Sequence, residues 1–259
     1  MIRVVSTGRL AWRYATGIMG LKLNDVWLAS YPRAGSTWVR FILCNLISLS
    51  ELDRRPVDFH FVGATMPSLG RSKLLKPWPY RIVPRFVKTH QSYRPFLFVR
   101  PRRAVYILRD PRDIMVSYYY FQQDHVRRPF RGSFAEFIRD ARYGLLACLQ
   151  HYRSWFPHAQ FVLRYEALKL NAVAELQEMF TKLQVPVSDE LLRLAVENSS
   201  FKKMRAMETE GGISDSNRFA RSFKTVRKGK SRQWSDFFSD EDLAFYEQVC
   251  QEYGFDVYS

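Results

Sequence analysis

The stretch that decides the fold runs from Val26 to Trp38 and reads Val26-Trp27-Leu28-Ala29-Ser30-Tyr31-Pro32-Arg33-Ala34-Gly35-Ser36-Thr37-Trp38. Its first five residues form a short apolar run that predicts a buried strand. The apolar residues from Trp38 to Ser48 instead follow the spacing of a helix. A tight turn between a strand and a helix directs several backbone N–H groups and the helix dipole at one spot, which favours an anion there.

The turn itself carries groups suited to a phosphate. Gly35 permits a close backbone approach, and Arg33 adds a fixed positive charge. Ser36 and Thr37 add hydroxyl donors. The ATP-binding form of such a loop needs Gly-x-x-x-x-Gly-Lys-Ser/Thr. Here no Lys follows Gly35 and no Gly stands five residues before it, which argues against a conventional ATPase loop.

Along the rest of the chain, short apolar runs alternate with longer helix-like segments, as in a parallel sheet covered by helices. The predicted strands are Val26–Ser30, Arg85–Lys88, Val105–Leu108 and Gln160–Arg164. The predicted helices are Trp38–Ser48, Pro111–Phe121, Ser133–Leu149, Ala172–Leu183, Ser188–Asn198 and Asp240–Glu252. No repeat or Gly/Ser linker interrupts residues 1–259, so we expect one α/β domain with a central parallel sheet flanked by helices.

The composition is strongly basic, with 40 Lys and Arg against 25 Asp and Glu, a formal net charge of +15. Such an excess attracts polyanions without distinguishing nucleic acid, anionic membrane or phosphorylated small molecules. Residues 1–24 form a basic amphipathic segment that we expect to lie on the domain, with peripheral membrane contact as the alternative. Three scattered cysteines, Cys44, Cys148 and Cys250, indicate reduced thiols in a cytoplasmic protein.

The first loop resembles the 5′-phosphosulfate loop of sulfotransferases that use 3′-phosphoadenosine 5′-phosphosulfate (PAPS). That loop usually reads Tyr-Pro-Lys-Ser-Gly-Thr-Thr-Trp. This sequence has Arg33 in place of the Lys, Ala34 in place of Ser, and Ser36 in place of Thr. The resemblance implies a P-loop-like sulfotransferase fold. It also implies that the cofactor is bound by Arg33, Ala34, Gly35, Ser36, Thr37 and Trp38.

A second motif follows the third predicted strand. Arg109-Asp110-Pro111-Arg112-Asp113, with Ser117 eight residues after Arg109, is similar to the 3′-phosphate motif of the same family. An arginine leaving a strand and a serine two turns into the next helix can reach one phosphate, which a guanidinium grips with two parallel hydrogen bonds. The resemblance implies that Arg109 and Ser117 bind the 3′-phosphate.

Three further segments agree, so the resemblance covers roughly Val26 to Phe238. Arg164-Tyr165-Glu166 and Asn198-Ser199-Ser200-Phe201, followed by Met204, are similar to the segments that contact the adenine. Val226-Arg227-Lys228-Gly229 resembles the segment that closes over the 3′-phosphate, and we expect a basic lid at residues 202–234. The further implied cofactor residues are Tyr165, Ser199, Phe201, Arg227, Lys228 and Gly229.

The second predicted strand ends in Lys88-Thr89-His90, the place where soluble sulfotransferases carry their general base. A neutral imidazole, with a pKa of about 6.5, can accept the proton that an acceptor hydroxyl loses. The resemblance implies that His90 is this base. It implies that Lys88, with Arg33, stabilises charge on the leaving group. No His, Cys or carboxylate cluster has metal-ligand spacing, so we expect no metal.

We therefore expect transfer of a sulfuryl group from PAPS to a hydroxyl or amine of a small-molecule, glycan or lipid acceptor, leaving the bisphosphate PAP. The acceptor cavity is expected between Phe59–Trp78, Tyr118–His125 and Met207–Phe219. One alternative is a nucleotide or small-molecule kinase, because Val105–Asp110 could be a strand ending in a Mg²⁺-holding carboxylate. The other is a nucleic-acid-binding protein, because Arg218–Arg232 contains seven basic residues and no acidic one; we expect no nucleic-acid partner.

Overall fold

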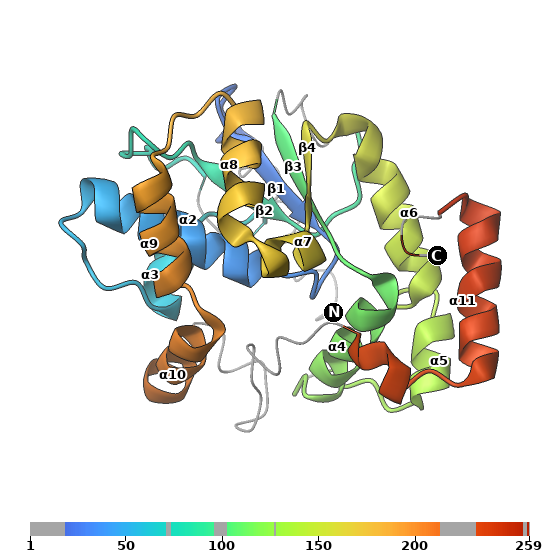
Figure 1. The fold of residues 1–259 in the computed structure, drawn as a ribbon. Helices are drawn as coiled ribbons and strands as arrows, with labels where there is room; N and C mark the ends of the chain where they lie inside the picture. The colour runs from blue at the N-terminus through green and yellow to red at the C-terminus, as the bar shows by residue number, and fades with distance from the viewer. Residues whose placement is uncertain are drawn as a thin grey trace, which may run out of the picture.

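The computed structural model describes residues 19–70, 74–95, 103–126, 128–212, 232–255 and 258. Its centre is a sheet of four parallel strands in the order β2-β1-β3-β4 (Figure 1). The strands are β1 (Val26–Ser30), β2 (Phe86–Thr89), β3 (Ala104–Leu108) and β4 (Phe161–Arg164). The expected α/β architecture is confirmed, and each strand lies within one residue of its predicted bounds.

The sheet forms from its apolar runs because both faces are covered. Every residue of β1 and β3 is buried, as expected for strands of a parallel sheet that lies between two helical layers. In the register, Leu28 pairs with Lys88 on one side and Val105 on the other. Leu108 pairs with Arg164. All four strands therefore end at the same edge of the sheet.

Helices cover both faces of the sheet. In Figure 1, α2, α8 and α9 lie together on one flank, and α6 with α11 outside it lies on the other. The helices are α2 (Ser36–Glu51), α3 (Phe59–Thr65), α4 (Pro111–Gln123), α5 (Phe134–Arg139), α6 (Leu145–Trp155), α7 (Tyr165–Leu170), α8 (Ala172–Lys182), α9 (Asp189–Asn198), α10 (Phe201–Gly211) and α11 (Asp240–Tyr253), with 3₁₀ turns η1 (Phe156–His158) and η3 (Gln233–Asp236).

The helix expected over Ser133–Leu149 is wrong, because the structure contains two helices, α5 and α6, in its place. Ser133 does begin α5 with a capping box. The helix ends where the Asp140 carboxylate accepts the backbone N–H groups of Arg142 and Tyr143, at 2.8 and 2.9 Å. Such local side-chain bonds offer the backbone an alternative to the helix. Gly144 then packs so closely on Ile138 that an added Cβ would lie 2.4 Å from its carbonyl oxygen.

Two expected segments lie largely outside the described residues. Within the expected lid at residues 202–234, the structure describes most of α10 and the start of η3. Residues 213–231 lie outside the described residues, as do residues 1–18 of the basic N-terminal segment. Within the described ranges, no helix is both long and apolar enough to cross a membrane.

Arg85, expected to open the second strand, instead lies just before β2 and fixes the amino-terminal edge of the sheet. Its guanidinium donates to both carboxylate oxygens of Asp25, at 2.7 and 2.6 Å. It also donates to the carbonyl oxygens of Gly20 and Leu74, both at 2.7 Å, and Lys76, at 3.3 Å. The pair is buried, with side chains 4% and 8% exposed. This network joins the segments that enter β1 and β2.

Candidate active site

Each of the four strands delivers predicted site residues at its carboxyl end. The phosphate loop follows β1, His90 follows β2, Arg109 follows β3 and Tyr165 follows β4. Because β2 and β3 lie on opposite sides of β1, the strand order reverses at β1, and ligands of open α/β sheets bind in the crevice at such a point. The topology therefore gathers residues that are far apart in the sequence.

The phosphate loop has the backbone that an anion site needs. Arg33 and Gly35 both have left-handed φ angles, 72° and 109°. Gly35 caps α2 without a side-chain hydrogen bond, and the first turn of α2 has no acidic residue. Its N-terminal N–H groups and dipole are therefore directed toward an anion rather than toward a carboxylate of the helix itself. The ring of Tyr165 covers Gly35 so closely that a Cβ there would lie 2.6 Å from Cδ2.

Arg33 connects the two phosphate motifs. Its Nε donates to the hydroxyl of Ser117 on α4 at 3.1 Å, and its guanidinium carbon lies 5.1 Å from the ring centre of Phe121. The two candidate phosphate ligands Arg33 and Ser117 therefore meet directly, although 84 residues separate them. Both occupy one surface formed by the loop after β1 and one face of α4.

Arg109 is a buried cation, 6% exposed. Its Nη1 donates to the carbonyl oxygen of Arg33 at 3.1 Å, and its guanidinium carbon lies 4.4 Å from the ring centre of Tyr165. Its Nη2 lies 3.7 Å from a carboxylate oxygen of Asp113. A buried guanidinium is held in one orientation by such contacts, which suits planar recognition of a phosphate.

The predicted adenine contacts fall into two groups. Trp38 lies next to Tyr165, with ring centres 6.0 Å apart, and its buried Nε1 has no hydrogen-bond partner among the described residues. Phe201 opens α10 with 38% of its surface exposed. Ser199, in contrast to Phe201, is fully buried. Its hydroxyl donates to the carbonyl oxygen of Ala195 at 2.8 Å and accepts from the side-chain amide of Asn45 at 3.0 Å. The described contacts of Ser199 thus join α2 to α9.

His90 follows β2 directly, and its Nδ1 lies 2.7 Å from the carbonyl oxygen of Ser30 at the end of β1. A carbonyl oxygen only accepts, so Nδ1 carries the proton and Nε2 is the basic nitrogen of the neutral ring. Lys88, two residues earlier, is half-buried on β2, and its backbone also bonds to Pro67 and Leu69. The strand end therefore holds the candidate base and a cation close together in sequence and structure.

Sequence reasoning missed the polar contacts by which α6 holds the segment that follows His90. From α6, Trp155 Nε1 donates to Gln91 O at 2.8 Å, and Ser154 Oγ accepts from Tyr93 N at 3.0 Å. His151 on the same helix is hydrogen-bonded to the Tyr106 hydroxyl at 2.7 Å. Burial lowers the pKa of His151 to about 4, so its ring is neutral near pH 7. The helix predicted from apolar spacing ended at Leu149, before the three residues that make these polar contacts.

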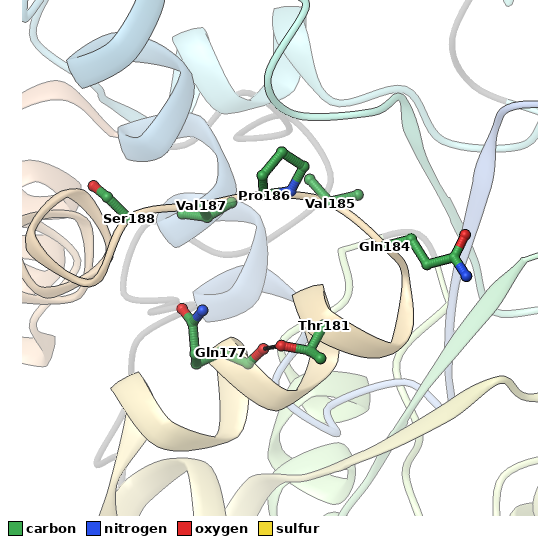
Figure 2. Close-up of a pocket in the computed structure, with 7 residues that line it drawn as sticks. All are labelled: Gln177, Thr181, Gln184, Val185, Pro186, Val187 and Ser188. Atoms are coloured by element: carbon green, nitrogen blue, oxygen red, sulfur yellow. Dashed lines mark hydrogen bonds between the residues drawn. The ribbon is translucent and has the colours of Figure 1, made fainter.

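Two observations concern other ligands. Among the described residues, no group of three or more His, Cys, Asp or Glu is arranged to hold a metal ion. A shallow groove of about 540 Å³ lies between α8 and the segment that leads to α9 (Figure 2). It is lined by Gln177, Thr181, Gln184, Val185, Pro186, Val187 and Ser188, and contains none of the predicted site residues.

Comparison with known proteins decides the family. The family model described as the sulfotransferase domain matches residues 23–254, nearly the whole chain. The chain belongs to the sulfotransferase family. It is therefore an enzyme of the PAPS-dependent sulfotransferase class, as the two phosphate motifs predicted.

Curated sulfotransferases match at low identity over most of their length. Sulfotransferase 1 family member D1 of Mus musculus is 26% identical over 250 residues, 89% of this chain and 82% of the relative. Sulfotransferase 1B1 of Canis lupus familiaris is 26% identical over 254 residues, 90% of this chain and 81% of the relative. The similarity thus spans the sheet and all the motif segments of this sulfotransferase.

Solved structures show the same fold. Mouse sulfotransferase SULT7A1, complexed with PAP, superposes with a TM-score of 0.63 at 22% identity, covering 92% of this chain and 86% of that chain. Retinol dehydratase, in complex with androsterone and PAP, superposes with a TM-score of 0.70 at 18% identity, covering 92% of this chain and 83% of that chain. The sulfotransferase fold of this chain is thereby confirmed.

Proposed function

We propose that this sulfotransferase transfers the sulfuryl group of PAPS to a hydroxyl or amine of a small acceptor, with His90 as general base. One observation carries the proposal: the hydrogen bond from Nδ1 to Ser30 O leaves Nε2 as the proton acceptor at the carboxyl end of β2. The same edge of the sheet carries the phosphate loop. Base and anion site are therefore adjacent.

The cofactor residues fit a nucleoside bisphosphate. The uncapped start of α2 suits the 5′-phosphosulfate, and the buried guanidinium of Arg109 suits the 3′-phosphate. Trp38 stands in the first turn of α2, directly after the phosphate loop. Tyr165 lies beside it and provides a flat apolar surface for a base. The expected Arg227, Lys228 and Gly229 lie outside the described residues.

In the proposed step, His90 Nε2 accepts the acceptor's proton while the acceptor oxygen or nitrogen forms its bond to sulfur. The bond from sulfur to the bridging oxygen of the 5′-phosphate breaks, and the electron pair stays on that oxygen. Arg33 and Lys88 stabilise the negative charge that develops there, the usual means of catalysis in the related phosphoryl transfer. The products are the sulfated acceptor and PAP, and the proton leaves from His90.

The kinase alternative loses its main support in the structure. Asp110, the carboxylate expected to hold Mg²⁺, instead caps α4 by accepting the N–H of Arg112 at 2.9 Å. Its carboxylate also pairs with the Arg112 guanidinium, with Nη2 and Oδ2 2.9 Å apart. A carboxylate bound in this way is already charge-compensated by its neighbour.

The acceptor and the location belong to the same proposal. The solved complexes of retinol dehydratase contain retinol or androsterone, which supports a small, largely apolar acceptor here. Cys44, Cys148 and Cys250 are all free and buried, which supports the expected reducing, cytoplasmic location.

Thermal unfolding with added ligands tests the proposal. PAP at a concentration of about 100 times its Kd stabilises a protein that binds it by about 2.7 kcal/mol. We therefore expect PAP to raise the melting temperature clearly and ATP–Mg²⁺ or an oligonucleotide to do so far less. Labelled PAPS incubated with a panel of phenols and alcohols should then give a sulfated product. Equal stabilisation by ATP–Mg²⁺, with no transfer, would contradict the proposal.

A further inference from the structure

Asp113 is a buried carboxylate that neither the motifs nor the catalytic scheme assigns. It lies in the first turn of α4, four residues after Arg109, and is 2% exposed. A buried carboxylate near a site for a phosphate dianion repels the ligand unless a cation or hydrogen-bond donors compensate its negative charge. Its contacts show how that charge is used.

The carboxylate of Asp113 accepts three consecutive backbone N–H groups from a distant part of the chain. Oδ2 accepts from Arg232 at 2.8 Å, and Oδ1 accepts from Gln233 at 2.8 Å and Trp234 at 3.3 Å. Arg232 has a left-handed φ of 59°, which turns the chain so that its N–H and the next two converge on one point. Asp113 thus fixes the residue that ends the basic run Arg218–Arg232.

The same carboxylate faces the buried cation of the 3′-phosphate motif. Its Oδ2 lies 3.7 Å from Arg109 Nη2, while Arg109 Nη1 bonds to the phosphate loop through Arg33 O at 3.1 Å. One oxygen of Asp113 therefore contacts both Arg109 and the Arg232 N–H. The orientation of the guanidinium and the position of Arg232 depend on a single charged group.

A neighbouring contact strengthens this connection. Arg112, the residue before Asp113, lies with its guanidinium carbon 4.1 Å from the ring centre of Trp234. The first turn of α4 thus holds η3 by a charged group and by a cation–π contact. A carboxylate that served only to interact favourably with the dipole of α4 would not have to contact the backbone of η3 or the guanidinium of Arg109.

We propose that Asp113 is a positioning residue for recognition of the 3′-phosphate. Its carboxylate orients Arg109 and fixes Arg232 at the same site. This inference rests on the proposed function, because it assumes that Arg109 binds the 3′-phosphate. In Asp113→Asn, the shape is kept but one acceptor oxygen becomes an N–H₂ donor. If the amide nitrogen replaces Oδ2, it faces Arg109 Nη2 and the Arg232 N–H. If it replaces Oδ1, it faces the N–H groups of Gln233 and Trp234. In either orientation a donor faces donors.

The test compares two ligands that differ only by the 3′-phosphate, PAP and 5′-AMP, by calorimetry on the full chain. Asp113→Asn should raise the Kd for PAP about tenfold or more, the effect of losing one charge-assisted hydrogen bond, and should change the Kd for 5′-AMP much less. Asp236→Asn, the same substitution at an exposed position of η3, is the control and should leave both constants unchanged.

A double-mutant cycle then shows whether Asp113 acts through Arg109. Once Arg109 is replaced by Ala, the further change Asp113→Asn should weaken PAP only slightly, because coupled residues are not additive. If Asp113→Asn does not fold, Asp113→Ser keeps one acceptor oxygen without a new amide and is measured in the same way. Equal loss for PAP and 5′-AMP, or unchanged PAP affinity, overturns the inference. A wild-type protein that does not prefer PAP to 5′-AMP overturns the proposed function instead.

Discussion

His90 Nδ1 lies 2.7 Å from the carbonyl oxygen of Ser30, a contact between the ends of two neighbouring strands. This bond selects the ring tautomer, because the carbonyl can only accept a hydrogen bond. It also links the ring to the end of β1, which is paired with β2 up to Ala29 and Thr89. A base held in this way is oriented before any substrate arrives.

Replacement of His90 by Ala should therefore lower kcat by roughly 10²-fold or more, the usual contribution of a general base. The Kd for PAP should hardly change, because no phosphate contact is assigned to the ring. His158→Ala, at an exposed histidine of η1, is the matched control. Steady-state kinetics and calorimetry give the two values, and an active His90→Ala enzyme would direct the search to a carboxylate base.

Arg33 stands where the family usually has Lys, and its bond to Ser117 gives it a fixed place in the site. Because a guanidinium does not deprotonate in proteins, its contribution to leaving-group departure is electrostatic only. Arg33→Ala should lower kcat by about 10²-fold, the order of losing one charge-stabilising donor. Arg33→Lys keeps the charge and should retain more activity than Arg33→Ala. Equal loss in both variants would show that shape rather than charge matters at this position.

Gly35 is required both by its φ of 109° and by the Tyr165 ring, which an added Cβ would meet at 2.6 Å. At Gly254, only the backbone requires glycine, because its φ is 60° and an added Cβ would meet nothing within 4 Å. Gly254→Ala should cost about 1–2 kcal/mol of unfolding free energy, the penalty of a left-handed residue. Gly35→Ala should cost more and should also weaken PAP, because the displaced Tyr165 no longer supports Arg109. Denaturant unfolding and PAP titration measure both effects.

His151 should make the protein less stable in mild acid. Its pKa is lowered from 6.5 to about 4 by burial, so below pH 6.5 the unfolded chain takes up a proton that the folded protein still refuses. The unfolding free energy should therefore fall by about 3 kcal/mol between pH 7 and pH 4, and the contribution of this residue should level off below about pH 3. His151→Gln removes the titrating group. The difference between the two pH profiles gives the effect, and parallel profiles would refute it.

How far the sequence predicts this molecule depends on the separation of the contacting residues. The phosphate loop and the Arg109 motif are each continuous in sequence, so their resemblance to the sulfotransferase motifs was enough to locate them. Asp113 received no role because the backbone N–H groups that it accepts begin 119 residues later, at Arg232. The break between α5 and α6 was missed for another reason: Asp140 bonds to backbone N–H groups, which apolar spacing does not reveal.

The expected acceptor wall at Tyr118–His125 separates into two kinds of residue. Tyr119 packs among Phe130, Phe134 and Phe137, with ring centres 6.3, 5.5 and 5.5 Å away, and its hydroxyl donates to Gly132 O at 3.2 Å. Phe121 instead lies against the guanidinium of Arg33 in the candidate site. The two rings are two residues apart on α4 but face different surroundings.

Truncation of these two rings should therefore have different effects. Tyr119→Ala should lower the unfolding free energy by on the order of 2 kcal/mol through the cavity it leaves, with the acceptor KM unchanged. Phe121→Ala should raise the acceptor KM and leave the Kd for PAP nearly constant, because Phe121 contacts Arg33, which is assigned to the 5′-phosphosulfate, and none of the residues assigned to the adenine. Tyr119→Phe, which keeps the ring and removes only the bond to Gly132, is the control for packing. If Phe121→Ala loses stability while its acceptor KM stays the same, the ring belongs to the core, and the acceptor cavity must be sought along Phe59–Trp78 instead.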